Sequence, residues 1–330
     1  MLSMVDLSLS ATLLIVGSLW LALAIDRWLG EPSARWHPVV WMGFYLGWIG
    51  AFIAPQRAQT GAADYKRFGL GALAWIAGAA LVLIVTAALQ QGLQQLPTLL
   101  GLVLLGLLLK PLLAWRMLRG EVLAVEAALV ESLPAGRTRL AWLVSRDVQA
   151  LSAAEVRESA IESLAENLND SVVAPIFWFV LLGLPGAALY RFANTADAMW
   201  GYRGVYQGRD WAWAGKWAAR ADDVLSWLPA RLTALLLALV NGGLSLRTLR
   251  WEAGRTPSPN SGWPMAAMAL ALGVSLRKPG VYVLHEQGRA PLANDTGRAA
   301  VLASKVVLAL AMIVTSAIVL IAFSVRELPP

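Results

Sequence analysis

Four long apolar stretches constrain this chain more than any other feature of its sequence. They cover residues 10–28, 68–89, 96–115 and 301–323, and each is close to the ~20 residues that a helix needs to cross a hydrocarbon core. A backbone inside a bilayer must satisfy its own hydrogen bonds, so such stretches fold as helices. We therefore predict an all-α integral membrane protein with about four full transmembrane helices, re-entrant or interfacial helices, and a large cytoplasmic helical face.

Composition supports the membrane class and excludes several kinds of site. Hydrophobic residues make up 58% of the 330 residues and charged residues only 15%, where soluble domains carry about 25%. The chain has no cysteine, which excludes a disulfide framework, a thiolate metal site and a cysteine nucleophile. It has only two histidines, so a histidine-rich zinc or iron centre is excluded as well.

Three further apolar stretches, 37–54, 172–190 and 224–244, contain helix-breaking residues. Broken backbone at membrane depth is tolerated where protein or a cavity covers it. We expect these stretches to dip into the membrane and return, or to lie along its interface. The breaks would fall at Pro175, Pro185, Gly186 and Pro229.

Basic residues predict the topology. Lysine and arginine concentrate in the segments 27–35, 55–67, 116–157, 191–220 and 246–298. The positive-inside rule puts all five on the cytoplasmic side, which leaves both chain ends outside. We treat residues 1–330 as one polytopic membrane domain, with a cytoplasmic helical loop at 116–170 and further cytoplasmic loops at 191–220 and 245–298. The basic residues form no separate patch, so nucleic acid is excluded as a partner.

The densest polar segment is a run of acids after residue 152. Ser152 and Glu155 have the spacing of a capping box, which predicts a helix start. From there Glu158, Glu162, Glu166 and Asp170 recur every four residues and form one stripe. Like charges at that spacing destabilise a helix, so the stripe indicates a divalent cation, and oxygen ligands favour Mg²⁺. A solvated helix face is the alternative. We favour the cation because the stripe runs into the apolar segment at Val172, with the amides of Asn167 and Asn169 nearby.

A second polar group follows the Gly183–Gly186 break. Arg191, Asn194 and Asp197 share one helical face, and arginine binds phosphate or carboxylate with paired hydrogen bonds. An interfacial helix with aromatic and arginine anchors explains the same pattern equally well.

Three other groups have structural alternatives. Asp222 and Asp223 next to an apolar dip need a metal or a cation such as Arg220 or Arg231. The segment 257–264 predicts a rigid turn. His37, which lies with Asp26 and Glu31 at a membrane boundary, is more often structural than catalytic in such a context. Phosphate-loop, dinucleotide-binding and nucleophile-elbow motifs are absent from the sequence.

Taken in order, these motifs resemble the adenosylcobinamide-phosphate synthases of cobalamin biosynthesis, the CbiB/CobD membrane family. The resemblance covers nearly the whole chain. The matching text is Asp26-Arg-Trp-Leu-Gly-Glu-Pro, His37-Pro-Val, Ser145-Arg146-Asp147, Glu162-Ser-Leu-Ala-Glu166-Asn167 with Asp170, Gly183-Leu-Pro-Gly-Ala187, Tyr190-Arg191, Asn194-Thr-x-Asp197, Gly201-Tyr202-Arg203, Asp222-Asp223, Pro229-Ala-Arg231-Leu and Ser258-Pro-Asn260-x-Gly-Trp-Pro264.

The resemblance implies an amide ligation. The family joins the propionate carboxylate of adenosylcobyric acid, a corrinoid, to the amine of aminopropanol phosphate, using ATP and Mg²⁺. The Mg²⁺ ligands would be Glu162, Glu166, Asp170, Asp222 and Asp223. The acids that act in catalysis would be Asp147, Glu166 and Asp197. The substrate and phosphate ligands would be Asp26, His37, Arg146, Asn167, Arg191, Asn194, Tyr202, Arg203, Arg231, Ser258 and Asn260.

The resemblance also implies a place and partners for the chain. We expect a multi-pass protein of the bacterial inner membrane, in contact with membrane lipid, whose active face is cytoplasmic. A homo-oligomer and contacts with other enzymes of cobalamin assembly are expected too. Two alternatives remain, a non-catalytic membrane sensor of the AmpE type and a transporter. The intact acidic motifs argue against the sensor, and the lack of an internal repeat argues against the transporter.

Overall fold

The computed structural model describes residues 9–56 and 63–326, and most of these residues are helical. The chain divides into two compact units, each assembled from separate segments. The first unit takes up residues 1–113, 174–225 and 314–330, and the second takes up 114–173 and 226–313. The all-α class is confirmed. The predicted outside position of the chain ends concerns residues 1–8 and 327–330, which lie outside the described residues.

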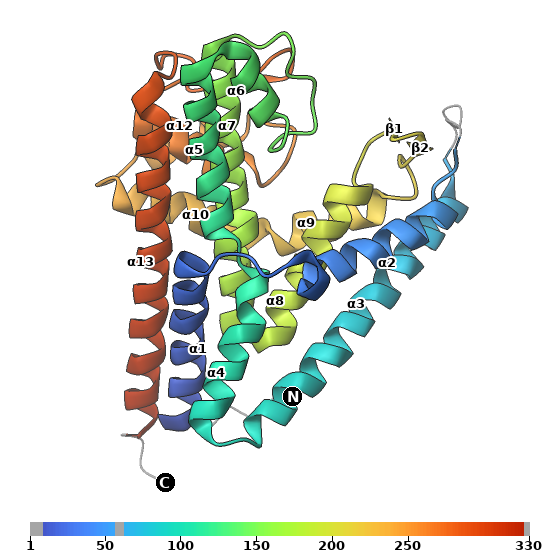
Figure 1. Cartoon of the computed structure of the whole chain (residues 1–330), viewed down its shortest axis with the longest axis vertical. Coiled ribbons are helices and arrows are strands. Elements are labelled where there is room, and N and C mark those ends of the chain that lie inside the picture. The colour runs from blue at the N-terminus through green and yellow to red at the C-terminus, as the bar shows by residue number, and fades with distance from the viewer. Residues whose placement is uncertain (1–8, 57–62, 327–330) are drawn as a thin grey trace. The chain divides into compact units, whose positions relative to one another are not determined.

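The first unit consists mainly of long apolar helices, and its α1 packs along α4 while α3 packs along α8 (Figure 1). A Cβ atom at Gly106 would lie 2.9 Å from Cδ2 of Leu21, so a small residue is what lets α1 and α4 approach. The elements are α1 (Leu9–Trp28), η1 (Ala34–Trp36), α2 (Pro38–Ile53), α3 (Tyr65–Gln94), α4 (Thr98–Leu109), η2 (Lys110–Leu112), α8 (Ala174–Trp200), β1 (Val205–Tyr206), β2 (Arg209–Asp210) and α9 (Lys216–Leu225).

Five helical stretches in the described residues are long and apolar enough to cross a membrane, or six if α9 and the following helix count as one broken span. They are Ala11–Trp28, Tyr65–Gln94, Thr98–Glu131, Ala153–Trp200 and Ala293–Ser324. All four predicted spans are among them. The additional stretch contains residues 172–190, which we expected to dip and return. A π-helical turn, η3 (Asn169–Val173), leads directly into α8, which itself contains a non-helical residue, Gly183.

The predicted break near Pro185 falls two residues earlier, at Gly183. Its φ of 69° and ψ of −157° are not helical, and glycine adopts such a conformation without steric cost. The side chain of Gln90 on α3 compensates for the break, because its Oε1 accepts a hydrogen bond of 2.7 Å from the backbone N–H of Leu184. The second half of α8 is therefore capped from a neighbouring helix.

The second unit is a bundle of shorter helices with one β-hairpin. Helices α5 and α6 pack together, and α12 packs against α7, α10 and α11. The predicted loop 116–170 thus consists largely of helix. The elements are α5 (Trp115–Glu131), α6 (Leu133–Leu140), α7 (Ala153–Leu168), α10 (Trp227–Val240), α11 (Leu246–Ala253), α12 (Gly262–Leu272), β3 (Leu276–Lys278), β4 (Tyr282–Leu284) and α13 (Ala293–Arg326), whose residues from 314 onward belong to the first unit.

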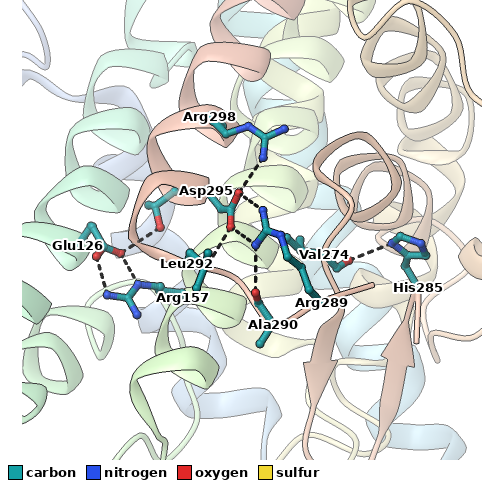
Figure 2. A network of polar contacts seen from close by, with 10 residues as sticks. Glu126, Arg157, Val274, His285, Arg289, Ala290, Leu292, Asp295 and Arg298 are labelled. Carbon is teal, nitrogen blue, oxygen red and sulfur yellow. Dashed lines mark hydrogen bonds and ion pairs between the residues drawn. The ribbon is translucent and has the colours of Figure 1, made fainter. Parts of the chain in front are cut away.

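Side-chain hydrogen bonds connect α5, α7 and α13 (Figure 2). Arg157 on α7 donates two hydrogen bonds to Glu126 on α5, and Thr296 on α13 donates a third. Asp295 is fully buried in the first turn of α13 and accepts hydrogen bonds from Arg289 and Arg298. A carboxylate is favoured at a helix N-terminus, and the two arginines offset the cost of burying its charge.

Candidate functional site

Helix α7, which carries the acidic stripe, begins as predicted. The side-chain oxygen of Ser152 accepts a hydrogen bond from the backbone N–H of Glu155, and Oε2 of Glu155 accepts one of 2.7 Å from the N–H of Ser152. This reciprocal pair satisfies two backbone donors that the first turn of a helix leaves open. The cap sets where α7 starts and therefore which residues share its faces.

The acidic stripe is not a solvated helix face. Glu158 and Glu162 are only 1% and 5% exposed. Each has an arginine partner, since Nε of Arg277 lies 3.2 Å from Glu158 Oε1 and Nη2 of Arg146 lies 3.3 Å from Glu162 Oε2. A buried carboxylate is costly without such a partner. The stripe therefore points into the second unit, where its charges are matched by cations from other segments.

Asp170 lies beyond the α-helical part of the stripe. Helix α7 ends at Leu168, and Asp170 lies in the π-helical turn η3, which has more residues per turn than an α-helix. Its Oδ1 accepts a hydrogen bond from Nδ2 of Asn169, and Oδ1 of Asn169 accepts one from Thr233 on α10. Asn169 thus links η3 to α10, and a Mg²⁺-binding role for Asp170 stays a prediction.

A polar pocket of about 170 Å³ lies beside α7 in the second unit. Its volume is below the ~300 Å³ at which pockets for drug-sized ligands begin, so it suits a small molecule or one group of a larger one. Arg146 donates to Ser159 as well as to Glu162, and Asn167 donates to the backbone oxygen of Ser163. Four predicted site residues line the pocket, namely Arg146, Glu162, Glu166 and Asn167, together with Ser145, Ser159, Ser163, Lys278 and Tyr282.

The hairpin of β3 and β4 supplies two lining residues that the sequence reasoning missed. Lys278 and Tyr282 face each other in the antiparallel register. Burial raises the pKa of the Tyr282 hydroxyl, and the charges of Glu162 and Glu166 raise it further, so this hydroxyl remains a hydrogen-bond donor. The Pro279-Gly280 pair between the strands is a turn signal that could have predicted the hairpin. No feature of the sequence predicts that this hairpin lies next to α7.

Asp147, the neighbour of Arg146, points elsewhere. It is exposed, and its Oδ1 accepts a hydrogen bond from the backbone N–H of Gln149, which is a local turn contact. It does not line the pocket. The structure thus brings Arg146 and Glu166 to one pocket and leaves Asp147 outside it.

Arg231, Ser258 and Asn260 form a separate structural cluster in the second unit. The guanidinium of Arg231 donates to Asn260 Oδ1 and to the backbone oxygen of Pro259, and it lies 4.4 Å from the Trp227 ring centroid. The hydroxyl of Ser258 accepts from the backbone N–H of Asn260. These contacts tie α10 to the predicted turn 257–264, and a phosphate-binding role for them stays a prediction.

In the first unit, Asp26 and His37 belong to a buried cluster of charges. The ammonium of Lys110 lies 3.4 Å from Asp26 Oδ1 and 2.7 Å from Glu31 Oε2, and Nε2 of His37 lies 3.2 Å from Glu31 Oε2. Lys110 is 3% exposed and Asp26 is 1% exposed. The sequence reasoning missed Lys110, because it read residues 96–115 as an uninterrupted span.

The remaining predicted residues lie on α8, α9 and the loop between them. Nη1 of Arg191 lies 3.5 Å from Asn194 Oδ1, which confirms that these two side chains share a face, and Asp197 follows half-buried. The ring of Tyr202 stacks on Tyr206 at 3.7 Å. The positive charge of Arg203 attracts the carboxylate of Asp223, and Asp222 directly precedes Asp223 on α9. Their roles toward substrate or metal stay predictions.

The predicted acidic ligands could hold a magnesium ion in only one way, in which the protein supplies few of the ligands. No group of three or more histidine, aspartate and glutamate side chains is placed to hold a metal within residues 9–56 and 63–326. Mg²⁺, however, is often held by one or two carboxylates together with substrate phosphates and waters. Glu162 and Glu166 at one pocket match that mode, and Oε1 of Glu162 is buried without a hydrogen-bond partner among the described residues.

Comparison with known proteins covers both units. A family profile described as "CobD/Cbib protein" matches residues 19–313. The chain belongs to the CobD/CbiB family. It is 42% identical over 278 residues to a "Probable cobalamin biosynthesis protein CobD" of Methanothermobacter thermautotrophicus, which covers 82% of this chain and 86% of that one. It is 41% identical over 289 residues to the "Cobalamin biosynthesis protein CobD" of Chromobacterium violaceum, with 84% and 89% covered.

The CobD/CbiB match extends to bacterial and archaeal relatives alike. The "Cobalamin biosynthesis protein CobD" of Rhizobium meliloti is 38% identical over 306 residues, which cover 88% of this chain and 89% of that one. The profile spans every predicted site residue from Asp26 to Asn260. No solved structure matches the chain.

Proposed function

We propose that this CobD/CbiB protein joins adenosylcobyric acid to aminopropanol phosphate to give adenosylcobinamide phosphate, in an ATP- and Mg²⁺-dependent amide ligation. The family and its relatives' names support a role in cobalamin biosynthesis. The observation that carries the finer proposal is the polar pocket, where two cations and two carboxylates line about 170 Å³. Such a set suits a small molecule that carries a phosphate at one end and an ammonium at the other.

The two cations are our candidates for the phosphate of the amine substrate. Arg146 is held by Ser159 and Glu162, so its guanidinium is oriented before a ligand arrives. Lys278 adds a second positive charge, and the protonated hydroxyl of Tyr282 adds a donor. Preorganised donors of this kind stabilise phosphate charge without reorganising during the reaction.

An acid must take a proton from the ammonium before the amine nitrogen can attack the activated carboxyl carbon. We assign this step to Glu166, which lines the pocket and is half-buried. The C–N bond then forms as the group that activates the carboxyl leaves with its oxygen.

Glu162 and Glu166 are also the residues that would hold Mg²⁺, which when bound would offset negative charge on phosphate oxygens. Because the sequence has no phosphate loop, the nucleotide would be held by other means.

Purified full-length protein in detergent tests the proposal. We expect ATP-dependent formation of adenosylcobinamide phosphate from the two substrates and Mg²⁺, followed by mass spectrometry. Glu166→Gln should abolish turnover without lowering expression, while Glu131→Gln, a change at an exposed acid of α5, should leave it intact. Absence of the product with the unaltered protein would refute the synthase activity. Normal turnover of Glu166→Gln at low Mg²⁺ would remove Glu166 from the metal and proton-transfer roles.

We further propose that the protein resides in the bacterial inner membrane with the polar pocket open to the cytoplasm. The chain has no cysteine, so single cysteines can be introduced without background. A cysteine at Glu131 or Trp142, both exposed in the second unit, should react with a membrane-impermeant maleimide only after the cytoplasmic face is opened. Labelling of intact cells from the periplasm would reverse this orientation.

A further inference from the structure

An apolar cavity of about 590 Å³ lies within the first unit, and none of the residues that line the polar pocket of the second unit contributes to it. Helices α2, α3, α4 and α8 contribute its walls, together with the segment that follows α1. Among the described lining residues only Glu31 and Lys110 are charged, and they pair with each other at 2.7 Å. The volume is in the range of a site for a small organic ligand, and the lining selects an apolar one.

The cavity has the length of one membrane leaflet. Its lining on α3 runs from Gly78 to Leu89, which at ~1.5 Å per residue is about 16 Å of helix. The hydrocarbon core of a bilayer is ~30 Å thick, so one leaflet contributes about half of that. A flexible apolar chain that fills the cavity along α3 therefore has the reach of one lipid acyl chain.

The cavity is open on the side of a helix that is long and apolar enough to cross the membrane. Leu81, Val85 and Leu89 line it, yet they are 56%, 47% and 43% exposed. All three belong to α3, whose exposed side chains in this stretch are apolar. An opening with such a rim admits a ligand from the bilayer more readily than from water.

The polar end of the cavity can accept hydrogen bonds. Oε1 of Glu31, which lines the cavity, is buried and has no hydrogen-bond partner within the described parts of the chain. A carboxylate oxygen accepts hydrogen bonds. This end therefore favours a ligand group that donates hydrogen bonds, as an ammonium does.

Two tryptophans next to this end place it at membrane-interface height. Trp36 and Trp41 line the cavity and are exposed. Amphipathic indole rings concentrate at the headgroup level of bilayers. A carboxylate acceptor at that level, together with an apolar cavity, matches the two ends of one phospholipid.

We propose that this cavity binds one acyl chain of a phospholipid whose headgroup carries a primary ammonium, as phosphatidylethanolamine does. The ammonium would donate to Oε1 of Glu31, and the chain would lie along α3 between Gly78 and Leu89. This lipid binding does not depend on the reaction proposed above.

The test compares two lipids that differ only in the headgroup. Full-length protein is reconstituted with equal amounts of phosphatidylethanolamine and phosphatidylcholine of identical chains, then extracted in mild detergent for native mass spectrometry. Choline cannot donate a hydrogen bond. We expect one retained lipid, with phosphatidylethanolamine favoured about fivefold, the factor that one additional hydrogen bond supplies. Equal retention of both lipids would overturn the headgroup assignment.

A pair of variants on α3 tests the location. Val82→Trp fills the cavity and should abolish the retained lipid, whereas Ile84→Trp, at a position that is 68% exposed and outside the lining, should preserve it. Equal retention by the two variants would place the lipid elsewhere. If Val82→Trp lost affinity for adenosylcobyric acid and kept its lipid, the cavity would belong to the corrinoid and the proposal would be wrong. Synthase activity is measured for both variants as well. Loss of the lipid can then be distinguished from failure of the proposed reaction.

Discussion

Arg157 on α7 donates two hydrogen bonds, of 2.8 and 2.7 Å, to the two carboxylate oxygens of Glu126 on α5 (Figure 2). The geometry is the bidentate fit of a guanidinium to a carboxylate, and both side chains are largely buried, at 18% and 14% exposure. Arg157 is the only cation within the acidic run, and it pairs with Glu126 on a neighbouring helix and not with an acid of the run. Glu158 and Glu162 therefore pair with cations from other segments, Arg277 and Arg146.

We expect Arg157→Met to destabilise the fold strongly, because it leaves the charge of Glu126 buried without its partner. Breaking a buried pair in this way costs about 3–5 kcal/mol. Thermal unfolding in detergent, at one scan rate for all variants, measures the effect. The matched control is Arg139→Met, whose pair with Glu121 is 34% and 30% exposed and is worth only ~0–1 kcal/mol. Equal effects of the two changes would contradict the importance of burial at Arg157.

Gly183→Ala tests the break in α8. An alanine would have to adopt a φ of 69°, and its Cβ atom would clash with the side-chain amide of Gln90. We expect a loss of stability on the order of 1–3 kcal/mol, since the backbone strain and the displaced cap add. The same substitution at Gly69 on α3, where no atom lies within 4 Å of the added Cβ, should be neutral or stabilising by about 0.5–1 kcal/mol. A neutral Gly183→Ala would show that the break carries no strain.

The pH dependence of stability tests Glu31. Burial acts to raise its pKa, but the hydrogen bonds and charges of His37 and Lys110 outweigh burial and hold the pKa of this carboxyl below its ordinary value. A group with a lowered folded-state pKa stabilises the fold above its unfolded pKa and loses that contribution as pH falls through the folded pKa. The difference in unfolding temperature between the unaltered protein and Glu31→Gln should therefore be largest near neutral pH and shrink as the pH falls below the ordinary pKa of glutamate. A difference that grew on acidification would reverse the sign and contradict the ion pair.

Arg146→Lys tests the polar pocket by kinetics. Lysine keeps the charge but cannot reach Ser159 and Glu162 while presenting a planar fork to a phosphate. We expect kcat/KM for aminopropanol phosphate to fall about 100-fold, with the KM for ATP little changed, as for a lost charge-assisted hydrogen bond. Arg119→Lys, a change at an exposed arginine of α5, is the control. A uniform rise in KM for all substrates would argue that Arg146 only supports the fold.

Much of the helical framework could be predicted from local patterns. The four apolar stretches reappear as helices, and the capping box starts α7 at the predicted residue. These features depend on hydrogen bonds and hydrophobicity along a few consecutive turns, which the sequence displays directly. The turn at Pro279-Gly280 belongs to the same class, although its hairpin was not predicted.

The polar pocket and the buried charges could be predicted only in part. Glu162, Glu166 and Arg146 stand out in the sequence, but their union with Lys278 and Tyr282 requires a hairpin more than a hundred residues away to pack beside α7. Lys110 shows the same limit, because a lysine inside an apolar stretch does not reveal that Asp26 and Glu31 will meet it.

The sequence by itself determined the class of this protein, its helices and its family, because hydropathy, caps and ordered motifs are local properties. The tertiary structure alone decided which acids are buried, which cations pair with them, that Asp170 lies in a π-helical turn, and that an apolar cavity is lined by the Glu31–Lys110 pair. The physical reason is that the cost of burying a charge depends on partners brought from distant segments, and no local pattern records them.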